Sequence, residues 1–329
     1  MDDFYLFKSG TIRRKNGSVV LDCDDEEILI PVAQLRTLNV FGEVNVNKRI
    51  LELFYHHGIS ILFFNYYGRL IGSFFPVSKS PVGDILSAQA IAVNDSGQCC
   101  HIASVIQIYS LNNCLSILKY YHKKGSMTAD SIMVIEETLQ ETSQCNSVEE
   151  ILLLEARAKK NYYKCFDQIL SNTEFSFEKR STRPPQNEFN AVISFGYHLL
   201  YGTVLAELHL SKLYPELAFI HSDQRSGYGL QYDLADIYKP VLVDRLFLGM
   251  IRRHQLLKTD FERREDGGVY LTVDGMKKCA AAYDNELQRK IRYGNRMRSY
   301  RSVIRYDIHQ LTRHLLDPTY PLKFYSHSW

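Results

Sequence analysis

Four side chains in residues 151–329 have the types and spacing for metal chemistry. The first is Glu155, which lies near the middle of the apolar stripe when residues 151–169 are placed on a helical wheel. A carboxylate on such a face binds or pairs with a cation, because an unpaired buried charge is costly. The alternative is a glutamate at the edge of the stripe that forms a salt bridge with a neighbouring helix.

A histidine and two aspartates follow. His221 lies in residues 219–229, where glycines and polar residues predict a loop after a helix. Asp233 and Asp236 are three residues apart, so both project from one helix face, where two carboxylates repel each other unless a cation or proton lies between them. Taken alone, His221 is explained by a structural role, and the aspartates by the favourable position of acids at a helix N-terminus.

Taken together, a Glu, a His and an Asp from separate elements predict a divalent-metal site. Two oxygen ligands and one imidazole, without cysteine, favour Mg²⁺ or Mn²⁺ over structural Zn²⁺. Basic residues accompany these acids in the sequence, namely Arg157, Lys159, Lys160, Lys164 and Arg225. A metal ion beside basic groups is typical of phosphodiester chemistry, in which the cation neutralises charge on the phosphate.

The elements before these residues are predicted to be mostly strands. Short apolar runs lie at 5–7, 11–12, 19–21 and 28–30, and Asn16-Gly17 predicts a tight hairpin turn between two of them. A helix is expected over 48–57, with Asn47 and Gly58 as its caps. Strands are expected over 59–64 and 70–75. Residues 1–76 therefore form a compact β domain with one short helix.

After this domain the helical period of 3.6 residues dominates. Prolines, serines and a glycine in residues 76–83 predict a linker, assigned to 77–83. Helices are expected near 84–95, 99–123, 147–171, 187–213, 241–258 and an interrupted 272–315. The predicted class is α+β, with an all-α domain over residues 84–329.

The net charge hides an uneven distribution. The 329 residues carry 39 Lys+Arg and 37 Asp+Glu, a formal charge of +2, which by itself argues against a nucleic-acid binder. However, residues 1–150 hold 12 basic and 17 acidic side chains (net −5), whereas residues 151–329 hold 27 and 20 (net +7). Residues 287–314 hold eight Lys+Arg and one acid. The charge is therefore compatible with a DNA contact confined to the helical part.

The basic segment 287–314 has two interpretations. Its arginines alternate with tyrosines, a pattern that suits phosphate contacts and stacking on unpaired bases, and Arg298 and Arg301 are the two candidates chosen here. The alternative is a solvated helix face on which arginine stems cover apolar surface.

Cysteine usage and the N-terminus indicate a compartment. The seven cysteines are odd in number and form no Cys-x-x-Cys pair, which predicts reduced thiols in a cytoplasmic chain. The acidic start Met1-Asp2-Asp3 has no apolar signal core, and no run approaches about 18 apolar residues, so no membrane span is expected.

An ordered set of short motifs resembles one known family, the CRISPR-associated spacer-acquisition integrases, or "Cas one" endonucleases. The resemblance covers nearly the whole chain. It includes residues 30–31, 40–44, 58–61 and 67–68 in the first part, and 155–157, 162–163, 183–185, 190–194, 197, 199–201, 221, 233–236 and 239–245 in the second. This chain departs from the family pattern with Ala156 after the glutamate and Lys239 before the proline, and neither position is a ligand.

The resemblance implies specific roles. The family's metal ligands fall on Glu155, His221 and Asp236, and Asp233 falls on a supporting catalytic acid. It implies an N-terminal β-sandwich, an α-helical domain, a homodimer formed largely through the N-terminal domain, a DNA substrate, and assembly with the small ferredoxin-like CRISPR-associated protein two in a prokaryotic cytoplasm. In this setting Arg183, Arg225 and Arg245 are candidates for phosphate contacts or for helix-to-helix pairing, two roles that the sequence does not separate.

The implied reaction is insertion of a short foreign DNA fragment into a CRISPR array, with a 3′-hydroxyl attacking a phosphodiester at the edge of a repeat. Two other functions stay open. A metal-dependent phosphohydrolase acting on nucleotides or small phosphoesters would use similar ligands, although the sequence lacks the His-Asp dipeptide expected of it. A DNA-binding architectural subunit with a vestigial site is the other.

Overall fold

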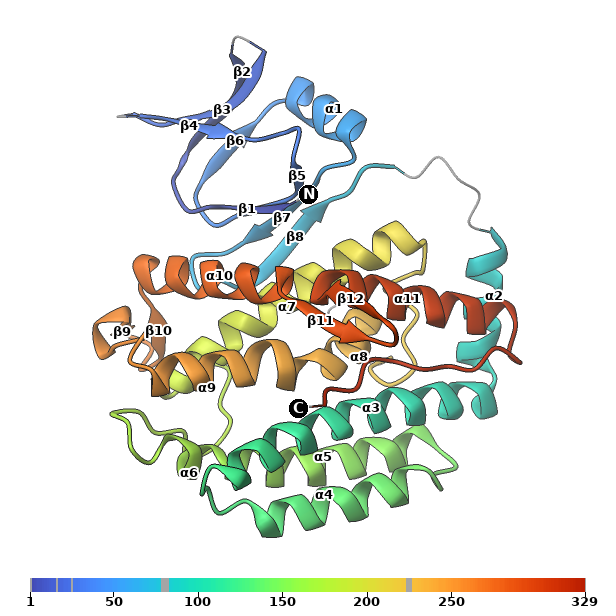
Figure 1. The fold of residues 1–329 in the computed structure, drawn as a ribbon. Coiled ribbons are helices and arrows are strands. Elements are labelled where there is room, and N and C mark those ends of the chain that lie inside the picture. Colours follow the sequence, from blue (N-terminus) through green and yellow to red (C-terminus); the bar gives the residue numbers. More distant parts are fainter. Residues whose placement is uncertain (1, 16, 25, 78–82, 223–226, 329) are drawn as a thin grey trace.

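The computed structural model describes residues 2–15, 17–24, 26–77, 83–222 and 227–328 (Figure 1). The N-terminal part consists of two four-stranded sheets. The first has the order β1(Asp2–Leu6), β5(Leu35–Val40), β7(Ser60–Phe64), β8(Leu70–Phe74), in which β1, β5 and β7 are parallel and β8 is antiparallel. The second has the order β4(Glu27–Ile30), β3(Ser18–Asp22), β2(Gly10–Lys15), β6(Val44–Val46).

The two sheets share one apolar core, which makes this part a β-sandwich. Buried side chains from both sheets meet there, among them Leu38 and Ile12, together with Phe54 of α1 (Lys48–His57). The predicted helix and both of its caps are confirmed, because the Asn47 side chain accepts the Ile50 N–H at 3.2 Å and Gly58 is left-handed with φ 67°. The predicted turn residue Asn16 lies outside the described residues.

The rest of the chain is mainly helical, and the predicted α+β class is confirmed. Its α-helices are α2(Gly83–Asn94), α3(Ser96–Lys123), α4(Ala129–Thr142), α5(Val148–Lys164), α6(Phe166–Leu170), α7(Glu188–Ser211), α8(Gly229–Tyr238), α9(Arg245–Arg252), α10(Val273–Gln288) and α11(Tyr300–Leu316). A π-helical segment, η1(Lys239–Asp244), joins α8 to α9. The sequence did not predict α4.

This part is not purely helical, which corrects the all-α prediction. It also contains two antiparallel hairpins, β9(Phe261–Arg263) with β10(Val269–Leu271), and β11(Lys290–Tyr293) with β12(Arg296–Ser299). The second hairpin interrupts the helical stretch that was predicted over 272–315.

Helix α7 lies at the centre of the fold and contacts β8, α8, α10 and α11. It approaches the first sheet closely, because a Cβ atom on Gly202 would lie 2.7 Å from the Leu62 side chain of β7. Within the described residues α7 is the one helix long and apolar enough to cross a membrane, but 83% of its apolar stretch is buried in the fold. Its composition is explained by its place in the core.

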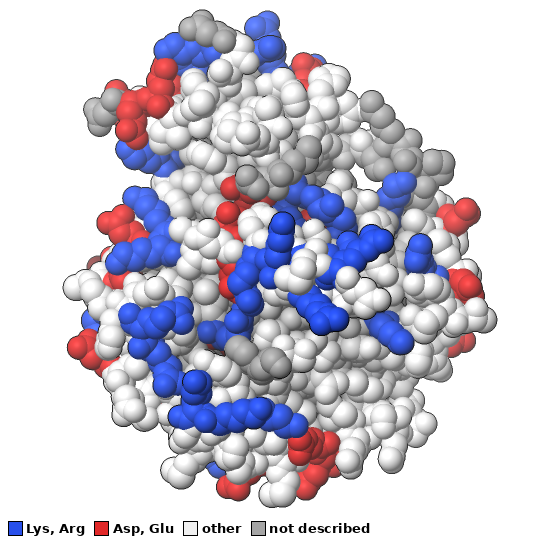
Figure 2. All heavy atoms as spheres, viewed as in Figure 1, with Lys and Arg blue, Asp and Glu red and all other residues white. Residues whose placement is uncertain are grey.

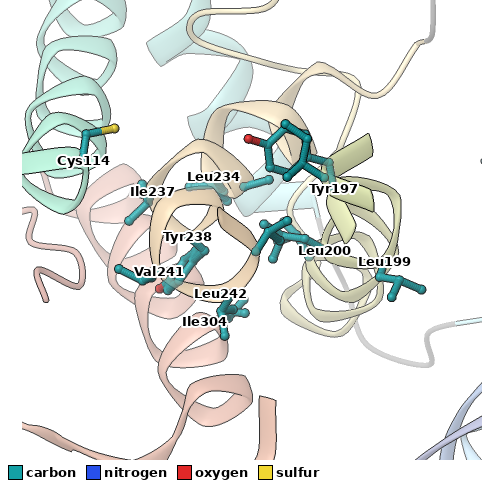
Figure 3. Packing of buried hydrophobic residues seen from close by; sticks show 14 of the residues in the cluster. Cys114, Tyr197, Leu199, Leu200, Leu234, Ile237, Tyr238, Val241, Leu242 and Ile304 are labelled. Carbon is teal, nitrogen blue, oxygen red and sulfur yellow. The ribbon is translucent and has the colours of Figure 1, made fainter. Parts of the chain in front are cut away.

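The core around α8 positions the residues of the candidate site. Figure 3 shows apolar side chains of α8 and η1, including Ile237 and Val241, next to Cys114 of α3, Leu200 of α7 and Ile304 of α11. Polar contacts fix the same packing, because the Asn113 side chain of α3 donates to the Ile237 carbonyl at 2.7 Å. Helix α8 is therefore held on several sides.

Candidate metal centre

The fold brings Glu155, His221 and Asp236 together from three elements. Glu155 is on α5, His221 is in the loop before α8, and Asp236 is on α8. One ligand atom from each lies within 4.8 Å of the other two. Asp236 is 3% exposed, and the other two are half-buried. The three side chains that sequence and resemblance selected as ligands thus form one cluster.

Helix α5 directs Glu155 toward this cluster. Its first turn is capped by Ser147, whose hydroxyl accepts the Glu150 N–H at 3.2 Å. Ile151, Ala158 and Tyr162 are buried, as the helical wheel predicted. On the other side of α5, Arg157 pairs with Glu141 of α4 at 2.9 Å. This basic neighbour of Glu155 therefore serves helix packing.

Asp233 holds His221 in place. Its Oδ1 lies 2.7 Å from His221 Nδ1 and accepts the His221 backbone N–H at 3.0 Å. Its Oδ2 accepts the backbone N–H groups of Phe219 at 2.8 Å and Ile220 at 3.1 Å. Since a carboxylate only accepts, His221 Nδ1 carries the proton, and Nε2 keeps its lone pair for a cation. Asp233 is fully buried and acts through His221.

Gly229 allows the His221 loop to lie close against the start of α8, a role that the sequence did not reveal. It is the first residue of α8, and a Cβ atom there would lie 2.4 Å from the His221 carbonyl oxygen and 2.6 Å from the Ala218 Cβ. Any larger residue would push the His221 loop away from α8. The glycine-containing loop was noticed in the sequence, but the close approach is visible only in the fold.

Two lysines neutralise Asp236. Lys239 forms an ion pair with its Oδ1, and the Lys159 Nζ lies 3.8 Å from its Oδ2. Lys239 also lies over the rings of Tyr197 at 5.2 Å and Tyr201 at 5.1 Å. It precedes Pro240, which has no N–H to continue an α-helix, and the chain widens here into the π-helical segment.

The charges shift the pKa values of the cluster in different directions. Burial, followed by the nearby charge of Asp236, raises the pKa of Glu155 to about 7. Burial alone would raise the pKa of Asp236, but Lys239 and then Lys159 outweigh it and hold that pKa well below its ordinary value. For His221 burial lowers the pKa, and the hydrogen bond and charge of Asp233 outweigh this, so the net shift is upward.

The donor set fits a hard divalent cation. Two carboxylates and a neutral imidazole nitrogen can converge on one ion, and Mg²⁺ or Mn²⁺ accepts such ligands. The raised pKa of Glu155 reflects two carboxylates held close in a partly dry setting. A cation among them would remove this repulsion.

The arginines predicted to contact phosphate lie in different surroundings in the structure. Arg301 is 4% exposed and pairs with Asp3 and Glu207, so it is buried between the sandwich and α7 and is not a DNA contact. Arg298 lies on β12 over the Tyr306 ring at 5.2 Å. Arg245 pairs with Glu286 of α10. Arg225 lies outside the described residues.

Arg183 lines a cavity of about 440 Å³ between the sandwich and the helical part. Arg69, Tyr67 and His198 also line it. Burial, and then the nearby arginines and Lys239, lower the pKa of His198 to about 3, so this side chain is neutral beside the cationic groups. The exposed Arg183 remains a candidate for a phosphate contact.

Basic side chains occupy the middle of one face of the molecule. In Figure 2, Lys and Arg side chains spread across the middle of the face, over the region where Figure 1 places β11, β12 and α11. The hairpin contributes Lys290, Arg292, Arg296 and Arg298. The positive charge that the sequence places near the C-terminus is thus concentrated in space as well.

A β-sandwich is joined here to a mainly helical part that carries a Glu–His–Asp cluster, and comparison with known proteins shows which family has this combination. Residues 4–285 match the family model described as CRISPR associated protein Cas1. CRISPR-associated endonuclease Cas1 of Thermotoga maritima is 33% identical over 318 residues (96% of this chain, 97% of the relative). CRISPR-associated endonuclease Cas1 2 of Thermodesulfovibrio yellowstonii is 32% identical over 315 residues, 95% of each chain.

Solved structures agree with these relatives. A CAS1 protein from Thermotoga maritima matches with a TM-score of 0.87 at 32% identity over 100% of both chains. A casposase bound to integration product shares the fold, with a TM-score of 0.88 at 18% identity over 100% of this chain and 95% of the other. This chain belongs to the Cas1 family, and the resemblance found in the sequence is confirmed.

Proposed function

We propose that this chain is a metal-dependent DNA endonuclease and integrase that inserts short foreign DNA fragments into a CRISPR array. The observation that carries the proposal is the convergence of Glu155, His221 and Asp236, with ligand atoms within 4.8 Å of one another. Membership of a family whose curated relatives are named CRISPR-associated endonucleases supports it.

The residues have distinct roles in this proposal. Glu155, His221 and Asp236 would hold Mg²⁺ or Mn²⁺, and such an ion would supply charge stabilisation at the scissile phosphate and help to orient the attacking oxygen. Asp233 fixes the tautomer and orientation of His221 through the 2.7 Å hydrogen bond. Lys159 and Lys239 keep Asp236 ionised. The cluster positions a 3′-hydroxyl, whose oxygen gives up its proton to solvent and attacks the phosphorus. The bond from phosphorus to the target strand's own 3′-oxygen breaks, and that oxygen takes up a proton from solvent, so the number of phosphodiester bonds and of protons is unchanged.

The proposal extends to the organisation of the protein. Residues 1–76 are the dimerisation domain of a homodimer, 77–83 the linker, and 84–329 the catalytic domain. The partners are double-stranded DNA with branched or single-stranded ends and the small ferredoxin-like CRISPR-associated protein two, in a prokaryotic cytoplasm. The fold also occurs in a Cas6-RT-Cas1–Cas2 complex, at 18% identity and a TM-score of 0.85, where this chain covers 36% of the other. At that identity the likeness concerns the fold alone.

Strand transfer on a branched DNA substrate tests the proposal against its alternatives. The wild-type chain should release or join strands only with Mn²⁺ or Mg²⁺, and His221→Ala should abolish the reaction while keeping the melting temperature within a few degrees. A phosphohydrolase of small substrates would leave the branched DNA intact but cleave a nucleotide. A binding subunit would shift the DNA in a gel without reaction. Strand transfer retained by His221→Ala would refute the ligand assignment.

A further inference from the structure

A strongly basic pocket lies outside the metal centre, along helix α9. Its cavity of about 650 Å³ is lined by α9 from Arg245 to Arg252 and by the C-terminal turns of α3 and α10. Five cationic side chains line it against one carboxylate, Glu286, a formal charge of +4. The cations are Lys124, Arg245, Arg252, Arg253 and Arg289. A concave surface with one sign of charge concentrates the field and attracts a polyanion.

The one acid that lines the pocket, Glu286, already forms ion pairs with two of the arginines. Glu286 pairs with Arg245 and, at 2.8 Å, with Arg289, so it organises these two arginines. Among the described residues no carboxylate forms an ion pair with Lys124, Arg252 or Arg253. Several cations without a counter-charge repel one another, and an anion would remove that repulsion.

Aromatic rings hold the unpaired cations in position without using their N–H groups. The Arg252 guanidinium lies 5.4 Å over the Tyr121 ring, and the Lys124 ammonium 5.9 Å over Tyr120. Tyr121 is 3% exposed, so its second face is not open for stacking with a base. The pocket therefore offers preorganised donors for phosphate oxygens and no aromatic slot at Tyr121 for a nucleobase.

The helix dipole explains only part of this arrangement. Each helix C-terminus favours one nearby cation. The dipole does not account for Arg245, which begins α9, or for the gathering of five cations around a single acid. The pocket is also tied to the metal centre, because α8, η1 and α9 follow one another without a break. Arg245 follows Asp236 by nine residues, a backbone separation of no more than about 14 Å along the axis.

From these observations we infer that the pocket binds backbone phosphates of the DNA substrate, several nucleotides from the bond that reacts. A duplex strand carries one phosphate per about 3.4 Å of axis, so the 14 Å to Arg245 corresponds to about four phosphates, and the 16 residues from Asp236 to Arg252, at most about 24 Å, to about seven. The inference rests on the proposed function for the identity of its ligand. It assigns Lys124 and Arg252 to phosphate binding and gives them no part in the chemistry.

The test compares Lys124→Gln/Arg252→Gln with a charge-matched control, Lys48→Gln/Lys277→Gln, in the full-length chain. Both control lysines are exposed and paired with an acid, Glu52 and Asp274. Duplex DNA affinity is measured against salt concentration. Because each phosphate contact contributes a slope of about 0.9, the pocket variant should have a slope shallower by up to about 1.8, and the control should match wild type.

The outcomes separate the two proposals. An unchanged slope in the pocket variant, in a protein that still transfers strands, overturns the pocket alone. A chain that binds DNA with the expected slopes but shows no metal-dependent reaction overturns the proposed function and leaves the pocket. Titration with ATP checks the other phosphate source: ATP binding that is lost in the variant, together with an unchanged DNA slope, would assign the pocket to a small phosphate ligand. A wild-type chain that binds no DNA overturns both.

Discussion

The Nδ1 atom of His221 lies 2.7 Å from Oδ1 of Asp233, a carboxylate that also accepts three backbone N–H groups of the same loop. One buried acid therefore sets both the path of the loop and the orientation of the imidazole. Replacing a residue that hydrogen-bonds to a metal ligand in this way typically weakens metal affinity by about 10–100-fold.

Asp233→Asn should accordingly weaken Mn²⁺ binding by about 10–100-fold, because an amide cannot accept from all four donors as the carboxylate does. Calorimetric titration with Mn²⁺ measures this. Asp167→Asn is the matched control, since Asp167 also accepts two loop N–H groups, from Phe177 at 2.6 Å and Glu178 at 2.8 Å. Equal Mn²⁺ affinity in the two variants would show that Asp233 is purely structural.

Gly229→Ala should reduce strand transfer and Mn²⁺ affinity although it touches no ligand. The new Cβ would lie 2.4 Å from the His221 carbonyl oxygen, so the loop must move. Gly83 is also the first residue of a helix, and a Cβ there meets nothing within 4 Å. Gly83→Ala should therefore keep wild-type activity, and equal activity of the two alanine variants would contradict the role given to Gly229.

The raised pKa of Glu155 predicts a pH dependence of stability in the metal-free chain. Between pH about 4.5 and about 7 the folded chain keeps a proton on Glu155 that the unfolded chain has released, so stability falls as pH rises through this range. Relative to Glu155→Gln, the wild-type free energy of unfolding should drop by up to about 3 kcal/mol between pH 4 and pH 8.

Chemical denaturation at the two pH values measures this difference. At pH 8, saturating Mn²⁺ should reverse the sign of the difference in free energy of unfolding between the wild-type chain and Glu155→Gln. The ionised carboxylate then binds the cation, so the wild-type chain becomes the more stable of the two. A difference that is independent of both pH and Mn²⁺ would contradict the placement of Glu155 in the cluster.

Arg301 and Arg298 should behave in opposite ways. Arg301→Ala leaves Asp3 and Glu207 without this buried counter-charge and should destabilise the fold by about 3–5 kcal/mol. Arg298→Ala removes only a ring contact, so it should cost less than about 1 kcal/mol and make the salt dependence of DNA binding shallower. Thermal unfolding and salt titrations distinguish them, and a stable Arg301→Ala variant with a shallower slope would restore the original DNA assignment.

Elements with a strong local signal were predictable from the sequence. The helix over 48–57 was found with both caps, because a side-chain acceptor at Asn47 and a left-handed Gly58 are local requirements. Helix α4 was missed because its buried face is mostly polar. Three of its four buried residues, Ser131, Thr138 and Thr142, give no apolar period.

The hairpin β11–β12 was missed for a different reason. Gly294-Asn295 is a typical hairpin turn pair, with Gly294 at φ 58°, and the residues on both sides of it alternate between basic and other side chains, but the helical period of the flanking segments favoured an interrupted helix over 272–315. Central strand β5 was missed because Thr37 and Asn39 are polar but buried. For α4 and β5 tertiary packing decided the structure against the local pattern, whereas the signal for the hairpin was local.

Of the predicted ligands, Glu155 was accessible from sequence because a carboxylate on an apolar helix face is chemically unusual, whereas the choice of His221 and of Asp236 over Asp233 depended on the family resemblance. The charge partners of Asp236 were not accessible from sequence. Lys159 and Lys239 were visible as basic residues near the acids, but their pairing with Asp236 depends on α5 and η1 meeting in space. Arg301 shows the converse, since a charge-rich segment does not indicate which of its arginines is buried.

The proposed reaction of the Glu155–His221–Asp236 cluster is the joining of DNA strands by transesterification. The most direct measurement follows a labelled donor fragment with a free 3′-hydroxyl, and the same fragment ending in a 3′-deoxynucleotide, on a CRISPR repeat target in the presence of Mn²⁺. We expect a covalent donor–target product from the hydroxyl-ended fragment alone, and none in His221→Ala. A product from the 3′-deoxy fragment, or cleavage of the target without joining of either fragment, would contradict it.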